Sequence, residues 1–185
     1  MFKYLFLFIV LITGITSRCQ TLKTTKHASF IPQGYTVLDS AFGNLNKDAY
    51  PDLLLILRNH TEKMNPDTTR PVILLAGSAN GTFKLLGRGD HVVFCANCGG
   101  VFGDPYQGIT IKNGFFSIEH YGGSSWRWTR IITFRYDPGT ATFKLHKDAG
   151  VSFHASDPNK QTSLAHQKEN YGKLTLDKYT YEASD

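Results

Sequence analysis

The chain has 185 residues, with 20 lysines and arginines against 15 aspartates and glutamates, and a formal net charge of +5. This length is typical of one domain. Because charges of both signs are interspersed, without a block of one sign, the basic balance does not indicate a nucleic-acid-binding protein.

The N-terminus has the layout of a secretory signal peptide. Residues 1–3 are a short basic start, residues 4–12 are apolar, and residues 13–17 supply small side chains for cleavage. A membrane-spanning helix needs about 20 apolar residues, more than this run contains. We therefore expect residues 1–20 to be removed and residues 21–185 to form a single exported β-rich domain in the periplasm, on the cell surface or in the medium. Cys19 leaves lipoprotein processing open, although Arg18 stands where that processing normally has a small residue.

Short apolar segments separated by turn signals predict β-strands through the first half of the chain. Residues 35–38 begin the first strand, and the continuous apolar run 52–57 indicates a strand that is covered on both faces. Residues 72–75 and 83–86 are expected to form a hairpin across Asn80-Gly81, a strong turn signal.

The loop before the second of these strands carries oxygen-bearing side chains at regular spacing. Asn44, Asn46, Asp48 and Asp52 occupy loop positions 1, 3, 5 and 9, and Tyr50 occupies position 7. Ca²⁺ takes about six to eight oxygen ligands, with a backbone carbonyl at position 7 in loops of this kind. The spacing is compatible with a calcium site. It is also compatible with an Asx-rich turn whose side chains cap their own backbone.

Residues 43–55 resemble the FG-GAP or VCBS-type calcium loop, which reads roughly Gly-Asp-Leu-Asn-x-Asp-Gly-x-x-Asp before a hydrophobic strand. More loosely, the chain is similar to exported bacterial proteins that combine one such loop with a later Trp/Tyr-rich strand. The resemblance implies a β-rich periplasmic or surface protein with Ca²⁺ as a cofactor. This chain departs from the pattern at Asn44, which replaces an aspartate, and at Ala49, which replaces the glycine of the sharp turn.

Cys95 and Cys98 remain after signal-peptide removal, and in an exported protein we expect a disulfide between them. A redox pair normally opens a helix, whereas residues 92–94 read as a strand that enters the loop at Gly99-Gly100. A zinc site formed with His91 and His120 is the other alternative.

The second half repeats the pattern of short strands, which are predicted at residues 108–112, 115–121, 126–136, 142–146 and 173–181. Residues 126–136 alternate, with one face that is apolar except at Arg130. The one weak helical signal covers residues 162–170. Eight or nine short strands predict an all-β, mainly antiparallel sandwich or curled meander sheet in a single domain. One loop copy is too few for a β-propeller.

Aromatic and basic residues surround the glycine loop at residues 122–125. Tyr121, Trp126, Arg127 and Trp128 are the residue types enriched at recognition surfaces, so we predict a binding patch there, together with the loop at residues 95–106. The alternative is that Trp126 and Trp128 fill the core face of their strand.

No nucleophile, base and orienting residue can be recognised together, so catalytic residues are not assigned. The sequence favours a non-enzymatic binding module of the cell envelope, whose partner is a protein or a glycan. One alternative is a periplasmic inhibitor or immunity protein that neutralises an envelope-targeting toxin or hydrolase. A second alternative is a hydrolase with an unrecognised site that includes His91, Glu119 or His120.

Overall fold

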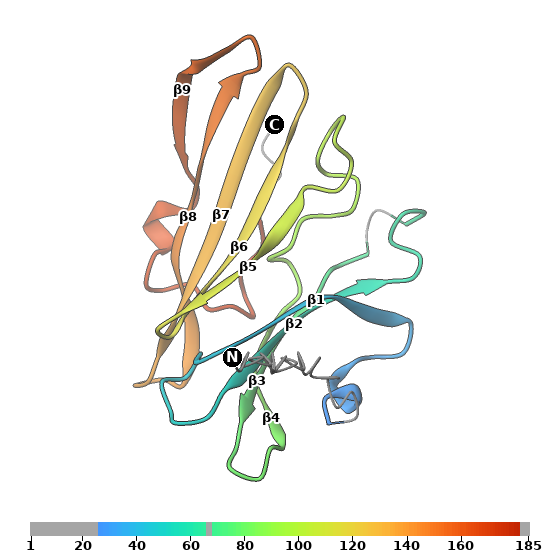
Figure 1. Cartoon of the computed structure of the whole chain (residues 1–185). Coiled ribbons are helices and arrows are strands. Elements are labelled where there is room, and N and C mark those ends of the chain that lie inside the picture. Colours follow the sequence, from blue (N-terminus) through green and yellow to red (C-terminus); the bar gives the residue numbers. More distant parts are fainter. Residues whose placement is uncertain (1–25, 66–67, 182–185) are drawn as a thin grey trace, which may run out of the picture.

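Nine strands form two antiparallel sheets in the computed structural model, which describes residues 26–65 and 68–181. The first sheet is a meander of β1 (Tyr35–Gly43), β2 (Asp52–Asn59), β3 (Val72–Gly77) and β4 (Phe83–Gly89). The second is a meander of β5 (Tyr106–Lys112), β6 (Phe115–Gly123), β7 (Trp126–Asp137), β8 (Thr142–His154) and β9 (Asp157–Ala165) (Figure 1).

This architecture confirms the predicted all-β, antiparallel fold class and is not a propeller. Two 3₁₀ turns, η1 (Ala28–Phe30) and η2 (Lys168–Asn170), flank the strands. Within the described residues, helices with the length and apolar character to cross a membrane are absent. The predicted signal peptide and Cys19 lie outside the described residues.

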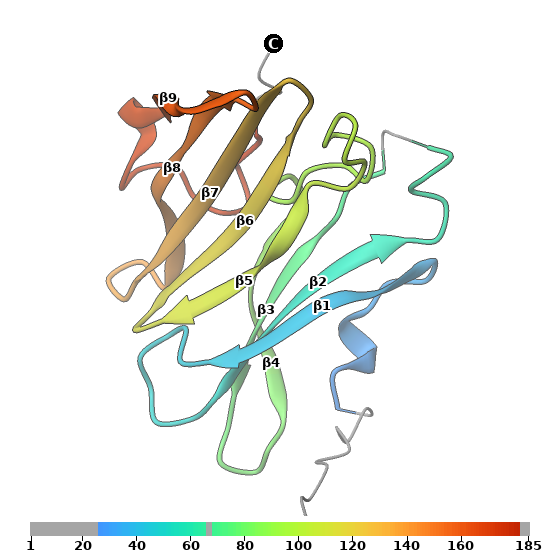
Figure 2. The same ribbon diagram turned by 45° about the horizontal axis from the view of Figure 1, so that its top comes forward.

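The two sheets meet along β1 and β5, which run side by side (Figure 2). The Tyr106 hydroxyl on β5 donates a 2.6 Å hydrogen bond to the Asp39 carboxylate on β1. Burial, reinforced by this carboxylate, raises the pKa of Tyr106, so the hydroxyl keeps the proton that it donates. At the other end of the second sheet, β6 to β9 extend past the first sheet (Figures 1 and 2).

Strand β2 is buried on both faces, as its continuous apolar run predicts. Leu54 and Ile56 point into the core between the sheets. Leu53, Leu55 and Leu57 point to the other face, where the N-terminal segment around Phe30 covers them. Burial of both faces explains why this strand does not alternate in polarity.

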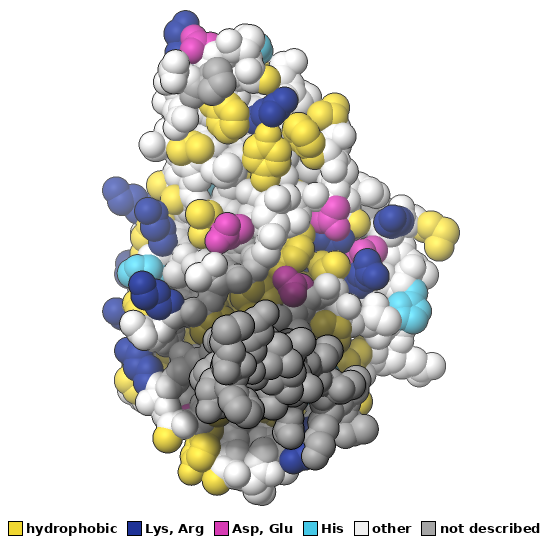
Figure 3. All heavy atoms as spheres, viewed as in Figure 1, with side chains coloured by type: hydrophobic (Ala, Val, Ile, Leu, Met, Phe, Trp, Pro, Cys, Tyr) yellow, Lys and Arg dark blue, Asp and Glu magenta, His cyan; other side chains and the backbone are white. Residues whose placement is uncertain are grey.

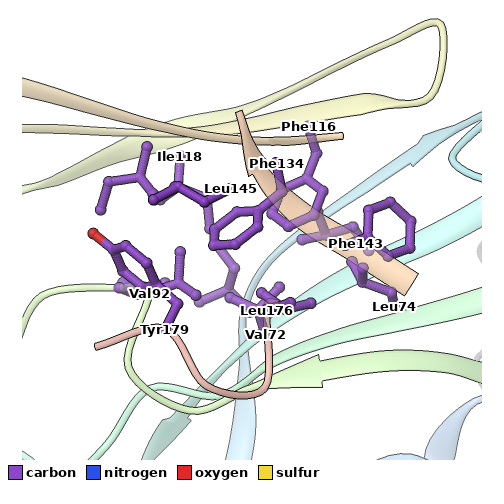
Figure 4. Close-up of a cluster of buried hydrophobic side chains, with 14 of the residues drawn as sticks. Val72, Leu74, Val92, Phe116, Ile118, Phe134, Phe143, Leu145, Leu176 and Tyr179 are labelled. Atoms are coloured by element: carbon purple, nitrogen blue, oxygen red, sulfur yellow. The ribbon is translucent and has the colours of Figure 1, made fainter. Parts of the chain in front are cut away.

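The main core fills the space between the sheets with side chains at alternate strand positions. Figure 4 shows its central part, to which Val72 and Leu74 come from the first sheet and Phe116, Phe134 and Leu145 from the second. Phe116 and Phe134 stack with ring centroids 5.4 Å apart. The predicted apolar face of β7 is confirmed, because Ile132 and Phe134 are fully buried.

Arg130 interrupts that apolar face and is buried with an acidic partner. Its guanidinium makes two hydrogen bonds of 2.7 and 2.8 Å to the Asp148 carboxylate on β8. The Tyr179 hydroxyl donates to the same carboxylate at 2.7 Å, and the Tyr171 hydroxyl donates to the Asp148 carbonyl at 2.7 Å. Burial alone would lower the pKa of Arg130, but Asp148 outweighs it and raises that pKa.

The C-terminal region differs from its prediction in two places. The alternating segment 173–181 is not a strand: it touches β8 through one isolated bridge, Lys144 to Thr175, and then turns. Its apolar side chains close the core instead, with Leu176 and Tyr179 buried (Figure 4). The predicted helical stretch is also wrong, because β9 pairs with β8 and the only helical piece there is η2.

We predict that Asp148→Asn destabilises the fold strongly. Removal of the carboxylate charge leaves the Arg130 guanidinium buried without its counter-ion, which costs about 3–5 kcal/mol. Urea unfolding at neutral pH measures the loss. The matched control is Asp90→Asn, which removes the partner of Arg88 in an exposed pair and should cost less than about 1 kcal/mol. Equal losses in the two variants would contradict the prediction.

Candidate functional site

The β6–β7 turn at residues 122–125, here called the hairpin tip, lies against the loop of residues 95–105, here called the disulfide loop. Val101 N–H donates to the Gly123 carbonyl at 3.1 Å, and Gly123 N–H donates to the Gly99 carbonyl at 3.0 Å. Gly123 has φ +109°, and a Cβ there would lie 2.1 Å from the Trp126 carbonyl oxygen. Glycine is therefore required at this position of the turn. The backbone bonds bring together the two loops at which the sequence predicts a binding patch.

A disulfide closes the start of the disulfide loop. Cys95 and Cys98 are bonded with their Cα atoms 5.2 Å apart, which agrees with the predicted pairing. Cys98 N–H also donates to the Cys95 carbonyl at 3.1 Å, and Gly99 N–H donates to the Gly103 carbonyl at 2.7 Å. The loop is therefore held by both a covalent bond and backbone hydrogen bonds.

Arg70 fastens both ends of the disulfide loop. Its side chain is 1% exposed and donates to the Phe94 carbonyl at 3.3 Å and to both Asp104 oxygens at 2.8 and 2.7 Å. Glu62 accepts two further bonds from the same guanidinium. Burial opposes the charge, but the two carboxylates outweigh it and raise the pKa of Arg70. This network could not be recognised in the sequence, because the acids lie 8 and 34 positions away from Arg70.

His120 supports the same loop from β6. Its ring stacks on Phe94 at 4.4 Å, and Nε2 accepts a 3.3 Å hydrogen bond from Phe94 N–H. Burial, followed by the charge of Arg130, lowers the pKa of His120 to about 3. The ring is therefore neutral near pH 7, as its acceptor role requires.

The sheet divides the four predicted binding residues into two pairs, because successive side chains of a strand point to opposite faces. Trp126 and Trp128 lie on the inner face, which also carries the core. Trp128 is partly buried against the core and lies 5.6 Å from Phe94, whereas Trp126 is 59% exposed. Tyr121 and Arg127 lie on the outer face, where the Arg127 Nη1 donates to the Tyr121 hydroxyl at 3.1 Å.

A groove of about 670 Å³ opens on the inner face beneath the hairpin tip. Its walls combine aromatic, aliphatic and polar side chains with glycine backbone, from the disulfide loop, the hairpin, β8 and β9: Gly100, Val101, Gly123, Ser124, Trp126, Trp128, Ser152, Leu164 and His166. The volume and the mixed lining are typical of a site for a small ligand or for a side chain of a partner protein.

The predicted calcium loop is held by hydrogen bonds among its own residues. Asp52 is fully buried, and its carboxylate accepts bonds from Leu45 N–H, Asn46 N–H and Gly77 N–H at 2.7, 3.1 and 3.0 Å. The Asp48 carboxylate accepts from Tyr50 N–H at 2.7 Å. These are the bonds of a self-capping turn, so a cation would have to share oxygens that already accept N–H groups. Ca²⁺ binding stays a prediction.

Two further details of that loop follow from the departures in its sequence. Asn44 turns its amide nitrogen toward the Asp48 carbonyl, an arrangement that an aspartate could not make. The left-handed residue is Lys47, with φ +66°, and Ala49 is not among the residues with positive φ. The turn thereby avoids the strain expected at Ala49.

Residues proposed for the alternative sites do not converge. Glu119 and His120 lie on opposite faces of β6, and His91 is exposed. The cysteines of the alternative zinc site are joined to each other. In the described part of the chain, no group of three or more histidine, cysteine or acidic side chains lies close enough together to hold a metal ion.

We predict that Asp52→Ala destabilises the protein by about 3 kcal/mol, because it leaves three N–H donors without an acceptor at a buried position. Urea unfolding in chelator and again in CaCl₂ measures the effect. Asp48→Ala is the control, since Asp48 is exposed, and its loss should stay below about 1 kcal/mol. A loss at Asp52 that vanishes in chelator would show instead that the carboxylate acts through a metal. Thermal stabilisation by CaCl₂ that Asp48→Asn abolishes would establish the calcium site.

We also predict that His120 weakens the fold as pH falls. The unfolded chain takes up a proton near the ordinary pKa of about 6.5, whereas the folded pKa is about 3. The contribution of His120 to the free energy of unfolding is therefore fully present above about pH 6.5 and is lost as pH falls toward 3. At pH 5 the loss is about 2 kcal/mol. Urea unfolding between pH 7 and pH 5 tests this against His120→Gln, which does not titrate. Parallel pH profiles for the two proteins would refute it.

Comparison with known proteins gives no assignment, because the chain matches neither a family model nor a curated protein nor a solved structure.

Proposed function

We propose that this protein is an exported, non-enzymatic binding module of the cell envelope whose ligand enters the groove at Trp126. The observation that carries the proposal is the exposure of this tryptophan, 59% accessible at the mouth of a groove of about 670 Å³. Trp is among the residues that dominate binding energy in recognition surfaces, and its position at the end of β7 contributes little to the core.

The exposed hydrophobic surface continues from the groove onto the disulfide loop. Val101 is 75% exposed and Phe102 is 44% exposed. Both follow a disulfide and are flanked by backbone bonds to the hairpin tip. Such a surface loses little conformational freedom on binding, so more of the contact energy remains as affinity.

The lining favours a ligand that offers both a flat apolar face and hydrogen-bonding groups. Trp126 and Trp128 supply rings, and Ser124, Ser152 and His166 supply polar atoms in the same groove. A sugar ring or a peptide side chain has this combination, which agrees with a glycan or a protein as the partner.

An inhibitor or immunity protein is the second candidate, and the shape of the hairpin tip favours it. The tip projects beyond the first sheet (Figure 1), and exposed apolar side chains flank it on the disulfide loop and on β7. A projecting tip with apolar side chains on its flanks can enter the cleft of a toxin or hydrolase. Co-purification with the product of an adjacent toxin gene, lost in Trp126→Ala, would favour this candidate over a glycan receptor.

We predict that Trp126→Ala lowers capture of envelope components at least about tenfold, the equivalent of about 1.4 kcal/mol. The unfolding free energy should change by less than about 1 kcal/mol, because the side chain is mostly exposed. The assay is retention of solubilised envelope extract on immobilised protein, with and without chelator. Phe42→Ala, a 53% exposed aromatic on β1, is the matched control and should retain capture.

Intrinsic fluorescence provides an independent readout, because the chain has two tryptophans and both line the groove. A ligand in the groove should change the emission of the wild type. It should leave the emission of a Trp126→Phe, Trp128→Phe double variant unaltered. Capture by Trp126→Ala equal to that of the wild type would reject the groove as the binding site.

A further inference from the structure

Arg127, on the outer face of β7 beside the hairpin tip, is a half-buried cation among aromatic rings. Its guanidinium carbon lies 5.2 Å from the centroid of the Phe102 ring, and its Nη1 donates to the Tyr121 hydroxyl at 3.1 Å. Phe102 and Tyr121 also contact each other, with ring centroids 5.1 Å apart. In Figure 3, hydrophobic side chains gather near the top of the molecule with a basic side chain among them.

The other arginines that are withdrawn from solvent have carboxylate partners. Arg70 has Glu62 and Asp104, and Arg130 has Asp148. Within residues 26–65 and 68–181, no acidic side chain pairs with Arg127, and the buried Nε–H of Arg127 lacks an acceptor. Partial burial of a charge without a counter-ion is unfavourable, and an anion from another molecule would supply the missing partner.

We propose that Arg127 is the recognition point for a carboxylate carried by the ligand, seated beside the Phe102 and Tyr121 rings. A guanidinium has five N–H donors. One is used by Tyr121 and one is buried on Nε, so three remain on Nη1 and Nη2. Two of these form the planar fork that a carboxylate accepts in bidentate fashion.

Charge favours a carboxylate over a phosphate at this position. Arg127 brings one positive charge, which one carboxylate neutralises. A phosphate monoester carries about −1.5 to −2 at neutral pH and presents three oxygens, more than one fork satisfies. The adjacent rings exclude water from one side of the pair, which strengthens the interaction.

This inference goes beyond the proposed groove and does not require it. Trp126 and Arg127 are consecutive residues on opposite faces of β7, so a ligand that grips the hairpin tip from both sides touches both. A ligand that fills the groove alone leaves Arg127 untouched. The groove is tested by Trp126→Ala and the carboxylate site by Arg127 variants, and either can fail separately.

The test is a titration of ¹⁵N-labelled full-length mature protein with sodium acetate, followed through the arginine Nε–Hε cross-peaks. The Arg127 signal is assigned by its disappearance in Arg127→Gln, and the buried Nε–H protects it from exchange with water. Arg135, an exposed arginine on the same outer face of β7, provides the internal control. Acetamide is the neutral isostere of the probe, and sodium chloride matches the ionic strength.

We expect acetate to shift the Arg127 signal saturably, with half-saturation at a concentration at least about tenfold lower than at Arg135. Acetamide and chloride should leave it in place. Arg127→Lys should weaken acetate binding, because an ammonium lacks the planar fork. In this variant, acetate binding is monitored through the shifts of the Phe102 and Tyr121 amide signals. Arg135→Gln should not change the response at Arg127. Equal responses at the two arginines, or a tighter response to phosphate or sulfate than to acetate, would overturn the assignment.

Discussion

The alternation of side chains along β7 is the constraint on which the rest of the structure depends. Its even positions build the core where the first sheet covers them, at Ile132 and Phe134, and line the groove where that cover ends, at Trp126. Its odd positions face outward and end in Arg127. A register slip of one residue would exchange these two sets. The same period that stabilises the fold therefore decides which chemistry appears on each face of the hairpin tip.

Sequence reasoning succeeded where burial imposes a period on the side chains. The two-faced run of β2, the alternating face of β7 and the Asn80-Gly81 hairpin could all be predicted, because each leaves a local pattern. Strand β9 could not, because its residues are mainly polar and it is positioned by backbone pairing with β8. The tail failed for the opposite reason. Leu174 and Leu176, and then Tyr179 and Tyr181, alternate with polar residues as in a strand. The buried Leu176 and Tyr179 instead fill the core from an irregular segment.

The candidate site was predicted in part for the same reason. The residue types around the hairpin tip and the cysteine pair are visible in the sequence, and the structure brings these two loops together. The sequence does not reveal how the loops are held. Arg70 joins partners that are distant in the chain, and His120 acts through a backbone N–H of Phe94. The separation of Tyr121 and Arg127 from the two tryptophans was implicit in period two, but a patch defined by composition ignores which face each side chain takes.

The loop at residues 44–52, where the sequence predicts a calcium site, and the hairpin tip lie at opposite ends of β6. The Asn44 carbonyl accepts from Gly114 N–H, next to the first residue of β6, and Gly123 at its last residue forms the contact with the disulfide loop. Nine residues of strand put about 25 Å between them. A cation at the loop would therefore be too far away to contact a ligand at Trp126 or Arg127. It could affect recognition only by stabilising the junction of the two sheets. Because three hydrogen bonds to the Asp52 carboxylate already join this loop to β2 and β3 of the first sheet without a cation, the ligand recognition that we propose for the hairpin tip should depend on the disulfide loop, Arg70 and His120 rather than on calcium.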